Sequence, residues 1–450
     1  MVDAPPPRET GQAQKVRAGL RRRHRAELRF RGYGIAAIVA ALSFVAILFG
    51  TIMVKGVPAF WQPVATLDVL FDPEIITVGE RPERQAGQSE NDYLIAIRNW
   101  ERNVATAPWN RLIEEAVRAK LPPGEYQARD LTGLIAGNER FKLRDMFLAD
   151  SDILGRTVTV NLLADANVDV WLKGNIDRTL PDSRQQLSAT TRAIADSFYE
   201  DGTIDMKFTS TLFFSVDSRS SPANAGLAGA FVGSLFMMLV VVLLAVPIGV
   251  ASAIYLEEFA PKNRLTDLIE VNINNLAAVP SIVFGLLGAA VFINTFHLPL
   301  SAPIAGGLVL TLMTLPTIII ATRAALKAVP PSIRQAALGL GASRVQTVFH
   351  HVLPLTAPGI LTATIIGVAQ ALGETAPLLL IGMSAFVAAV PATPFDPSTA
   401  LPVQIFLWQG NENRNFFEPR TSAAILVLLG LMILMNAVAI FLRQRFERRW

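Results

Sequence analysis

The stretch Arg334–Pro354, RQAALGLGASRVQTVFHHVLP, decides the fold, because it is a helix-forming loop between two long apolar segments. Gln335-Ala336-Ala337 favour a helix, and Gly341 can end it. Ser343 can cap a second helix, and Pro354 can open the next apolar span at a tolerated position. The stretch therefore predicts two short helices joined at a glycine. Such a knob, standing in water on one side of a bilayer, suits docking into another protein.

The composition is that of a membrane protein. Of 450 residues, 51% are hydrophobic and 17% are charged, whereas soluble domains are about 25% charged. Cysteine is absent, which excludes disulfides, thiolate chemistry and Cys-ligated metals. The adjacent pair His350-His351 is a poor metal site, since neighbouring residues on a helix point apart. We therefore predict no metal site and no catalytic site.

Charge is distributed unevenly along the chain. Residues 57–220 hold 18 Lys and Arg against 25 Asp and Glu, a net charge of −7, and the remainder holds 22 against 12, a net charge of +10. The basic residues cluster beside apolar segments, which indicates membrane topology and not nucleic-acid binding.

The apolar segments predict an all-α membrane protein with six spans and a soluble α+β domain inserted between the first two. Residues 1–31 form a mobile, basic cytoplasmic tail, and 32–56 hold the first span, whose uncharged part is long enough to cross about 30 Å of hydrocarbon. Residues 57–220 form the periplasmic insert. Residues 221–450 form a five-span domain with a cytoplasmic loop at 323–354. The expected later spans are Gly226–Tyr255, Val271–Phe296, Leu298–Thr322, Val352 to about residue 385, and Thr421–Leu442.

Basic residues next to the spans place both termini in the cytoplasm of a multi-pass inner-membrane protein. In the insert, hydrophobic periodicity predicts helices and strands, and its acidic pairs match no calcium-binding loop. The expected elements are a helix Asp92–Leu121 interrupted at Pro108, a helix Ser183–Tyr199 before a turn at Asp201-Gly202, and strands Thr157–Leu163 and Met206–Val216.

Glu374 is the one ionisable residue in the apolar stretch Val352–Phe395. An unpaired carboxylate there costs at least roughly 2.5 kcal/mol, so it must pair, protonate or face water. Pro377 lacks an N–H and frees the carbonyl of Gly373, which lets the helix open. Glu374 and Thr375 therefore form a candidate translocation path or intramembrane ion pair, and both readings stay open. Arg323 is the candidate partner.

No ATP-binding sequence is present. The chain contains no Gly-Lys dipeptide and hence no phosphate-binding loop of the GxxxxGK[ST] type. If ATP drives transport, a separate subunit binds it.

The loop resembles the coupling loop of permease subunits of bacterial ATP-driven importers. That family's motif is Glu-Ala-Ala, three residues, Gly, nine residues, then Ile-x-Leu-Pro. Here Gln335 replaces the acid and His351 the aliphatic residue, while the spacing is intact. The resemblance implies that an ATPase docks on Arg334, Gln335, Ala336, Ala337, Gly341, Ala342 and Ser343.

Two further segments, GETAPLL at Gly373–Leu379 and VPSIVFGLLG at Val279–Gly288, resemble the A-type permease of the bacterial phosphate importer, over Gly226 to the C-terminus. The family implies a type I importer fold and a non-catalytic subunit that forms half of a pathway for inorganic phosphate. It implies a second, C-type permease, two copies of an ATPase that binds ATP and Mg, and a periplasmic phosphate-binding protein, with no cofactor on this chain. Many members have Arg-Thr-Thr-Glu where this chain has Ile320-Ala321-Thr322-Arg323. Only some members carry an external insert.

Other functions remain open at this point. The permease could carry another oxyanion, such as sulfate or molybdate. The chain could also be a membrane-anchored periplasmic sensor, although no kinase or methyl-accepting module follows the spans. An enzymatic insert is a third alternative.

Overall fold

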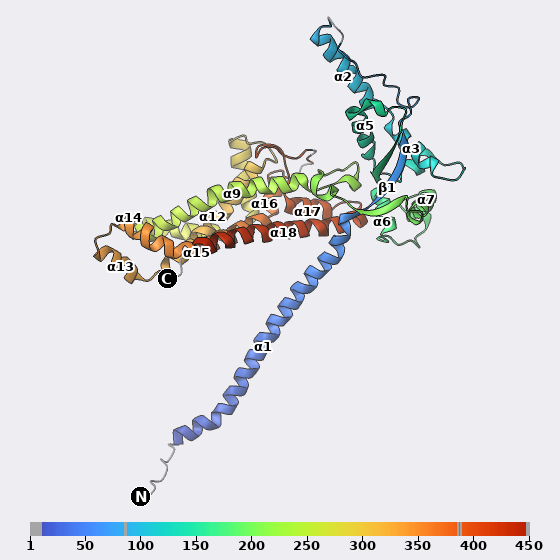
Figure 1. Cartoon of the computed structure of the whole chain (residues 1–450). Coiled ribbons are helices and arrows are strands. Elements are labelled where there is room, and N and C mark those ends of the chain that lie inside the picture. The colour runs from blue at the N-terminus through green and yellow to red at the C-terminus, as the bar shows by residue number, and fades with distance from the viewer. Residues whose placement is uncertain (1–10, 85–87, 385–386, 388, 447–450) are drawn as a thin grey trace. The chain divides into compact units, whose positions relative to one another are not determined.

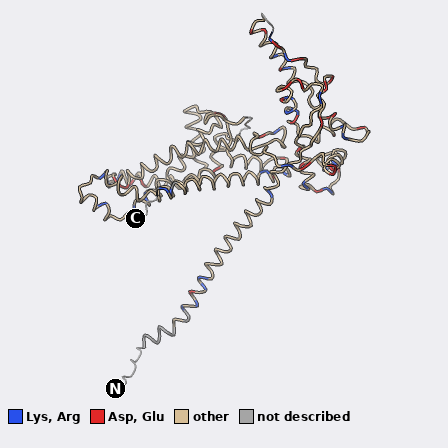
Figure 2. Tube along the Cα trace, in the orientation of Figure 1, with Lys and Arg blue, Asp and Glu red and all other residues tan. Residues whose placement is uncertain are grey.

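The computed structural model describes residues 11–84, 88–384, 387 and 389–446. The chain divides into two compact units, Met1–Lys55 and Gly56–Trp450. Helices dominate, and a small sheet lies in the insert (Figure 1). Charged residues gather on the insert, whereas the long helices of the second unit carry few (Figure 2).

The first unit is a single helix, α1 (Gly11–Gly56). It contains the expected first span, but it begins well before residue 32, so the described part of the tail, 11–31, is helical. The mobility expected of this tail stays a prediction, because a helical segment can still move as one body. The sequence there is rich in the helix formers Ala, Leu, Arg and Glu, and Arg31 Nη2 donates to Glu27 Oε1 at 2.6 Å, one turn away. The rest of the tail, 1–10, lies outside the described residues.

The insert is built on a three-stranded antiparallel sheet in the order β2-β1-β3. The strands are β1 (Trp61–Leu70), β2 (Thr157–Leu163) and β3 (Ile204–Phe208). The central strand, β1, buries Ala65, Leu67 and Val69 on one face. It was not predicted from the sequence, and it contains Pro63, which lies opposite Met206 of β3. The proline is tolerated because pairing with β2 begins only at Val64.

Helices cover the buried face of this sheet. They are α2 (Glu90–Thr106), α3 (Trp109–Ala119), α4 (Ala128–Thr132), α5 (Glu139–Ala149), α6 (Ala166–Leu172) and α7 (Ala189–Glu200). Trp100 and Trp109 pack on Phe147, with ring centroids 6.0 and 5.6 Å apart. This core confirms the α+β character of the insert.

Several of the insert's predicted elements are confirmed and others shift. Strand 157–163, the helix break at Pro108 and the turn at Gly202, where φ is +79°, are as expected. The predicted helix at 183–199 begins instead at Ala189, because Ser188 caps it by accepting from Thr191 N at 3.0 Å. The predicted strand 206–216 was wrong beyond Phe208, where α8 (Thr211–Phe214) follows.

The permease region is a bundle of long helices. They are α9 (Ala228–Ile254), α12 (Pro303–Lys327), α15 (Leu353–Gly373) and α18 (Arg414–Phe446). Helix α12 packs between α9 and α15, and α18 packs on α15. Among the described residues, five helices, α1 included, are long and apolar enough to cross a membrane.

The expected third span is not one straight helix. Helix α10 (Arg264–Ala277) ends before Pro280. Helix α11 (Ser281–Gly288) follows it and continues to Thr295 as a π-helix. The axis bends by 101° between α10 and this second segment. The proline cannot continue the hydrogen-bond ladder of α10. The pair makes a sixth crossing if it is counted as one broken span. The expected exit of the fifth span, which starts at Val352, near residue 385 falls outside the described residues.

Candidate functional site

The predicted knob is a helix–glycine–helix. Helix α13 (Pro331–Gly339) is followed by Gly341 with φ +90°, a left-handed backbone that favours glycine. Ser343 then caps α14 (Arg344–Gln346): its Oγ accepts from Gln346 N at 3.2 Å, and Gln346 Oε1 accepts from Ser343 N at 2.9 Å. This reciprocal cap fixes where the second helix starts. Helix α14 continues through a π-helical turn, Thr347–Val352, into α15.

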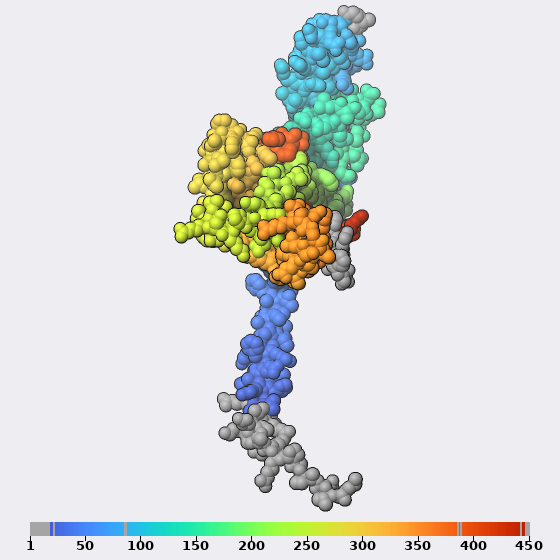
Figure 3. Space-filling model, turned by 90° about the vertical axis from the view of Figure 1, so that its left-hand side faces the viewer, coloured from blue at the N-terminus to red at the C-terminus, as the bar shows by residue number. Residues whose placement is uncertain are grey.

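The surface of the knob is unusually apolar. Four large apolar side chains are exposed on it, and all lie between α13 and the turn that leads into α15. They are Leu338 (46% exposed), Leu340 (91%), Val345 (55%) and Phe349 (51%). Of the predicted docking residues, Gln335, Ala336, Gly341 and Ser343 are exposed, Ala342 is half-buried and Ala337 is buried. Figure 3 views this end of the molecule, where the knob (orange) lies at the surface.

Arg334, another predicted docking residue, is turned toward the bundle. Its Nη2 donates to Glu258 Oε1 at 2.6 Å, and its Nε lies 3.2 Å from both carboxylate oxygens. It also donates to the carbonyls of Leu326 and Val329 at 2.9 and 2.8 Å. The guanidinium therefore clamps α13 onto the end of α12 and onto the segment that follows α9. Arg334 therefore lies against the bundle and not on the exposed face of the knob, and its predicted contact with an ATPase stays a prediction.

Arg323 also pairs within the chain. Its Nη2 lies 2.7 Å from Glu270 Oε1 on α10, and its Nε lies 3.3 Å from Glu257 Oε2. Lys327 Nζ reaches the same oxygen of Glu257 at 3.7 Å. The suggested pairing of Arg323 with Glu374 is therefore wrong in this structure. Sequence reasoning did not identify Glu257, Glu258 and Glu270 as the partners of these cations. The adjacent pair Glu257-Glu258, directly after an apolar span, could have pointed to them.

The helix opens at Glu374 as predicted. Helix α15 ends at Gly373, Glu374 is extended (φ −78°, ψ 130°), and the short α16 (Ala376–Leu380) follows Thr375. The Glu374 side chain is half-buried, and no hydrogen bond or ion pair to it is found within the residues that the structure describes. Gln370, one turn earlier, accepts from Thr317 Oγ1 on α12 at 3.4 Å. Polar groups thus follow one another along this part of α15.

The two broken segments pack against each other. Helix α11 contacts α16, and a Cβ added at Gly285 would lie 2.6 Å from Pro377 Cα. Only glycine allows this approach of the two backbones. The stretches 279–288 and 373–379, both singled out from the sequence, therefore meet beside Glu374.

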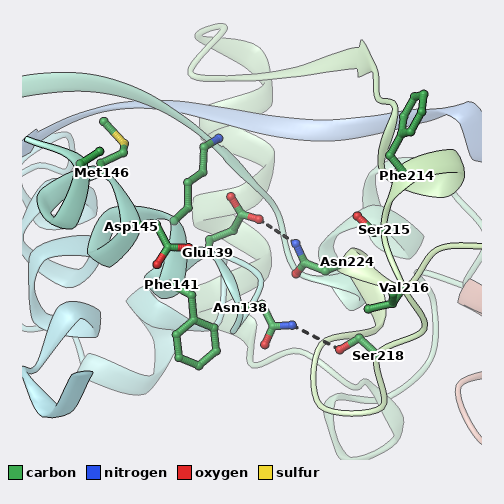
Figure 4. Close-up of a pocket in the computed structure, with 12 residues that line it drawn as sticks. Asn138, Glu139, Phe141, Asp145, Met146, Phe214, Ser215, Val216, Ser218 and Asn224 are labelled. Atoms are coloured by element: carbon green, nitrogen blue, oxygen red, sulfur yellow. Dashed lines mark hydrogen bonds between the residues drawn. The ribbon is translucent and has the colours of Figure 1, made fainter. Parts of the chain in front are cut away.

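A polar seam joins the insert to the permease helices. A hollow of about 750 Å³ lies between α5 and the segment 214–224, and Figure 4 shows the residues that line it. In it, Asn224 Nδ2 donates to Glu139 Oε1 at 2.8 Å, and Asn138 Nδ2 donates to Ser218 Oγ at 3.3 Å. Nearby, the buried Arg420 of α18 donates to the carbonyls of Ala223, at 2.8 Å, and Ala225. The seam fixes the chain where it enters α9.

A buried ion pair lies on the insert's side of this seam. Lys173 Nζ is 2.7 Å from Asp169 Oδ1 on α6. Burial raises the pKa of Asp169 and lowers the pKa of Lys173, so each shift reflects the loss of water around a charge. In the part of the chain that the structure describes, no three His, Cys, Asp or Glu side chains gather as metal ligands would.

Comparison with known proteins fits this arrangement. Residues 245–450 match the family described as binding-protein-dependent transport system inner membrane component, and residues 17–182 match a domain of unknown function. The probable ABC transporter permease protein YqgH of Bacillus subtilis is 31% identical over 263 residues, 56% of this chain and 80% of the relative. The chain belongs to this family of transporter membrane components.

Two further relatives are similar over shorter stretches. The probable ABC transporter permease protein YqgI of Bacillus subtilis is 33% identical over 167 residues, 37% of this chain but only 56% of the relative. The phosphate transport system permease protein PstA of Yersinia pestis is 30% identical over 224 residues, 50% of this chain and 74% of the relative. Family membership confirms the predicted fold class and a non-catalytic, cofactor-free subunit of the inner membrane.

Replacing Arg334 by Met should loosen the knob. Glu258, whose side chain is 9% exposed, would lose its charged partner, which costs about 1–3 kcal/mol for such a hydrogen bond. We expect faster amide hydrogen exchange across 331–346 in the purified chain. The exposed Arg344 is the matched control, and Arg344→Met should leave exchange unchanged. Equal exchange in the two variants would show that the clamp does not hold the knob.

Proposed function

We propose that the chain is the permease subunit of an ATP-driven importer and forms half of its transmembrane pathway for inorganic phosphate. The observation that carries the proposal is the knob at 331–346: a rigid helix pair with exposed apolar side chains, fixed to the helix bundle by buried charge. Membership of a transporter membrane-component family supports the permease role. The likeness to a PstA protein supports phosphate as substrate over sulfate or molybdate.

The knob docks into a separate ATPase subunit. The side chains that would enter an apolar cleft of the ATPase are the exposed apolar ones, Leu338, Leu340, Val345 and Phe349. The residues around them would be Gln335, Ala336, Gly341, Ala342 and Ser343. Ala337 of α13 is buried and would contribute to the packing of this helix. Arg334 acts indirectly, since it holds the knob in place. Movement of the ATPase would then reach α12 through Arg334, and α9 through Glu258, without bending the knob.

The translocation path runs beside Glu374. Broken helices at apolar depth, as at α11 and α16, are typical of transport sites because their free backbone groups can bind a substrate. Thr317, Gln370, Glu374 and Thr375 would line the path. A carboxylate repels an anion. Glu374 therefore acts either as a protonated donor to phosphate or as the partner of a cation on the second permease.

The assembly needs partners on both sides of the membrane. In this proposal the knob and both termini face the cytoplasm, where two ATPase copies bind ATP and Mg. The insert faces the periplasm, where a phosphate-binding protein delivers its cargo. The other half of the path is a second, C-type permease. The basic charge near the helix ends supports this orientation.

Gly341→Asp tests the docking role. Any L side chain at φ +90° strains the turn by roughly 1–2 kcal/mol, and the aspartate adds charge to an apolar docking surface. We expect several-fold less ATPase to co-purify with the chain, at normal membrane levels of the chain itself. Gly430→Ala on α18, where an added Cβ meets nothing within 4 Å, is the control. Undiminished co-purification would refute docking through this turn.

Glu374→Gln tests the path. Removing the charge while keeping the shape should lower uptake of labelled phosphate several-fold, with the ATPase still bound. Glu412→Gln, at an exposed position outside the helices, should transport normally. Wild-type uptake by Glu374→Gln would exclude Glu374 from both the path and an essential ion pair.

A further inference from the structure

Four aromatic rings form a continuous ridge at one end of the insert's sheet. Phe213 stacks on Phe60 at 5.4 Å between centroids, Phe60 lies 6.5 Å from Phe208, and Phe208 meets Trp61 edge-on at 5.7 Å. Large parts of three of these side chains face outward: Trp61 is 43% exposed, Phe208 60% and Phe213 39%. Phe60, Trp61, Phe208 and Phe213 are called the aromatic ridge below.

The ridge is assembled from separate parts of the chain. Phe60 ends a short 3-10 turn (Val57–Phe60), Trp61 opens β1, Phe208 closes β3, and Phe213 lies on α8. Trp61 and Phe208 are direct partners in the β1–β3 register. The fold therefore brings these rings together at the end of the sheet from which the chain continues toward the membrane helices.

The height of the ridge follows from its contact with α18. Gly56 packs so closely on this helix that an added Cβ would lie 2.9 Å from Ala423 N. Ala423 lies at the start of the uncharged run that begins at Thr421 and crosses the membrane. From Gly56 to Phe60 the 3-10 turn advances about 8 Å, at roughly 2 Å per residue. The headgroup layer on each side of the hydrocarbon is about 5–8 Å thick. With the hydrocarbon edge placed at Thr421 and the 3-10 turn running outward along the membrane normal, Phe60 and its stacked neighbours would lie at the level of the headgroups.

We propose that the aromatic ridge is inserted into the headgroup region of the leaflet on the insert's side, and that lipid covers it. Aromatic side chains concentrate at this depth, because their rings prefer the boundary between hydrocarbon and water. Exposed rings on a water-soluble domain would otherwise cost hydrophobic free energy. Protein docking needs no such height, so lipid is the occupant that the position favours.

Lipid contact would limit the insert's movement. Strand β1 starts at the ridge and ends at Leu70, about 30 Å away at roughly 3.3 Å per residue. One end of the sheet would be held in the membrane while the far end, with α2, stands in water. The insert would thus be held at a fixed height over the helix bundle by two restraints. One is lipid contact at the aromatic ridge, and the other is the polar seam at Glu139 and Arg420.

Spin labelling tests the proposal, and the absence of cysteine from the sequence makes it direct. Full-length Phe208→Cys and Phe213→Cys carry a nitroxide in nanodiscs of phosphatidylethanolamine and phosphatidylglycerol. We expect collisions with a water-soluble nickel chelate to be several-fold rarer, and collisions with oxygen more frequent, than for Leu70→Cys. Leu70 is the matched control, since it is 48% exposed and lies at the end of β1 away from the aromatic ridge.

Two results would overturn the proposal. Chelate access at 208 and 213 equal to that at Leu70 would put the ridge in water. Shielding that appears only after the external binding protein is added would make the ridge a protein-docking surface. The two positions lie on different elements, so Phe213→Cys still decides the question if Phe208→Cys does not fold.

Discussion

Two adjacent carboxylates, Glu257 and Glu258, hold the working end of this permease together. Glu257 forms ion pairs with Arg323 and Lys327 of α12, and Glu258 forms an ion pair with Arg334 of α13. The Arg323–Glu257 and Arg334–Glu258 pairs are largely shielded from water, so removing one partner leaves the other charge unpaired, whereas Lys327 is 59% exposed. Arg334 joins the exposed knob to the end of α12 and to the segment that follows α9, and we expect these contacts to make the knob rigid. A docking surface on a loose loop would absorb a partner's movement; this one would transmit it.

At the opposite end of the helix bundle, other polar side chains hold the segments together through hydrogen bonds. Arg420 is buried and donates to backbone carbonyls at the entry to α9, while Trp408 Nε1 donates to Asp217 at 3.0 Å. The insert is therefore no freely hanging domain: its chain enters and leaves through a hydrogen-bonded seam. Between the two ends, the helices are interrupted at Pro280 and at Glu374. A transport path needs such a combination of rigid ends and an open middle.

Local chemistry explains which features the sequence predicts. The turn at Gly341, the cap at Ser343 and the opening at Glu374 each depend on residues within a few positions, so reading along the chain finds them. The inward direction of Arg334 does not follow from its surroundings, because its partner lies 76 residues away. The same holds for Arg323, whose nearest acids are on α10 and after α9, not in the stretch that carries Glu374. The break at Pro280 is local, since proline ends a helix, but the size of the bend there, 101°, and the central strand β1 depend on tertiary packing.

The central claim, that this chain carries phosphate, is tested most directly by uptake at low external phosphate. Cells lacking the gene are compared with cells complemented by it, in the presence of excess sulfate or molybdate. The account predicts that uptake of labelled phosphate is lost, is restored by the gene and is insensitive to both competitors. Unchanged phosphate uptake in cells lacking the gene, or rescue that either competitor abolishes, would contradict phosphate as the substrate.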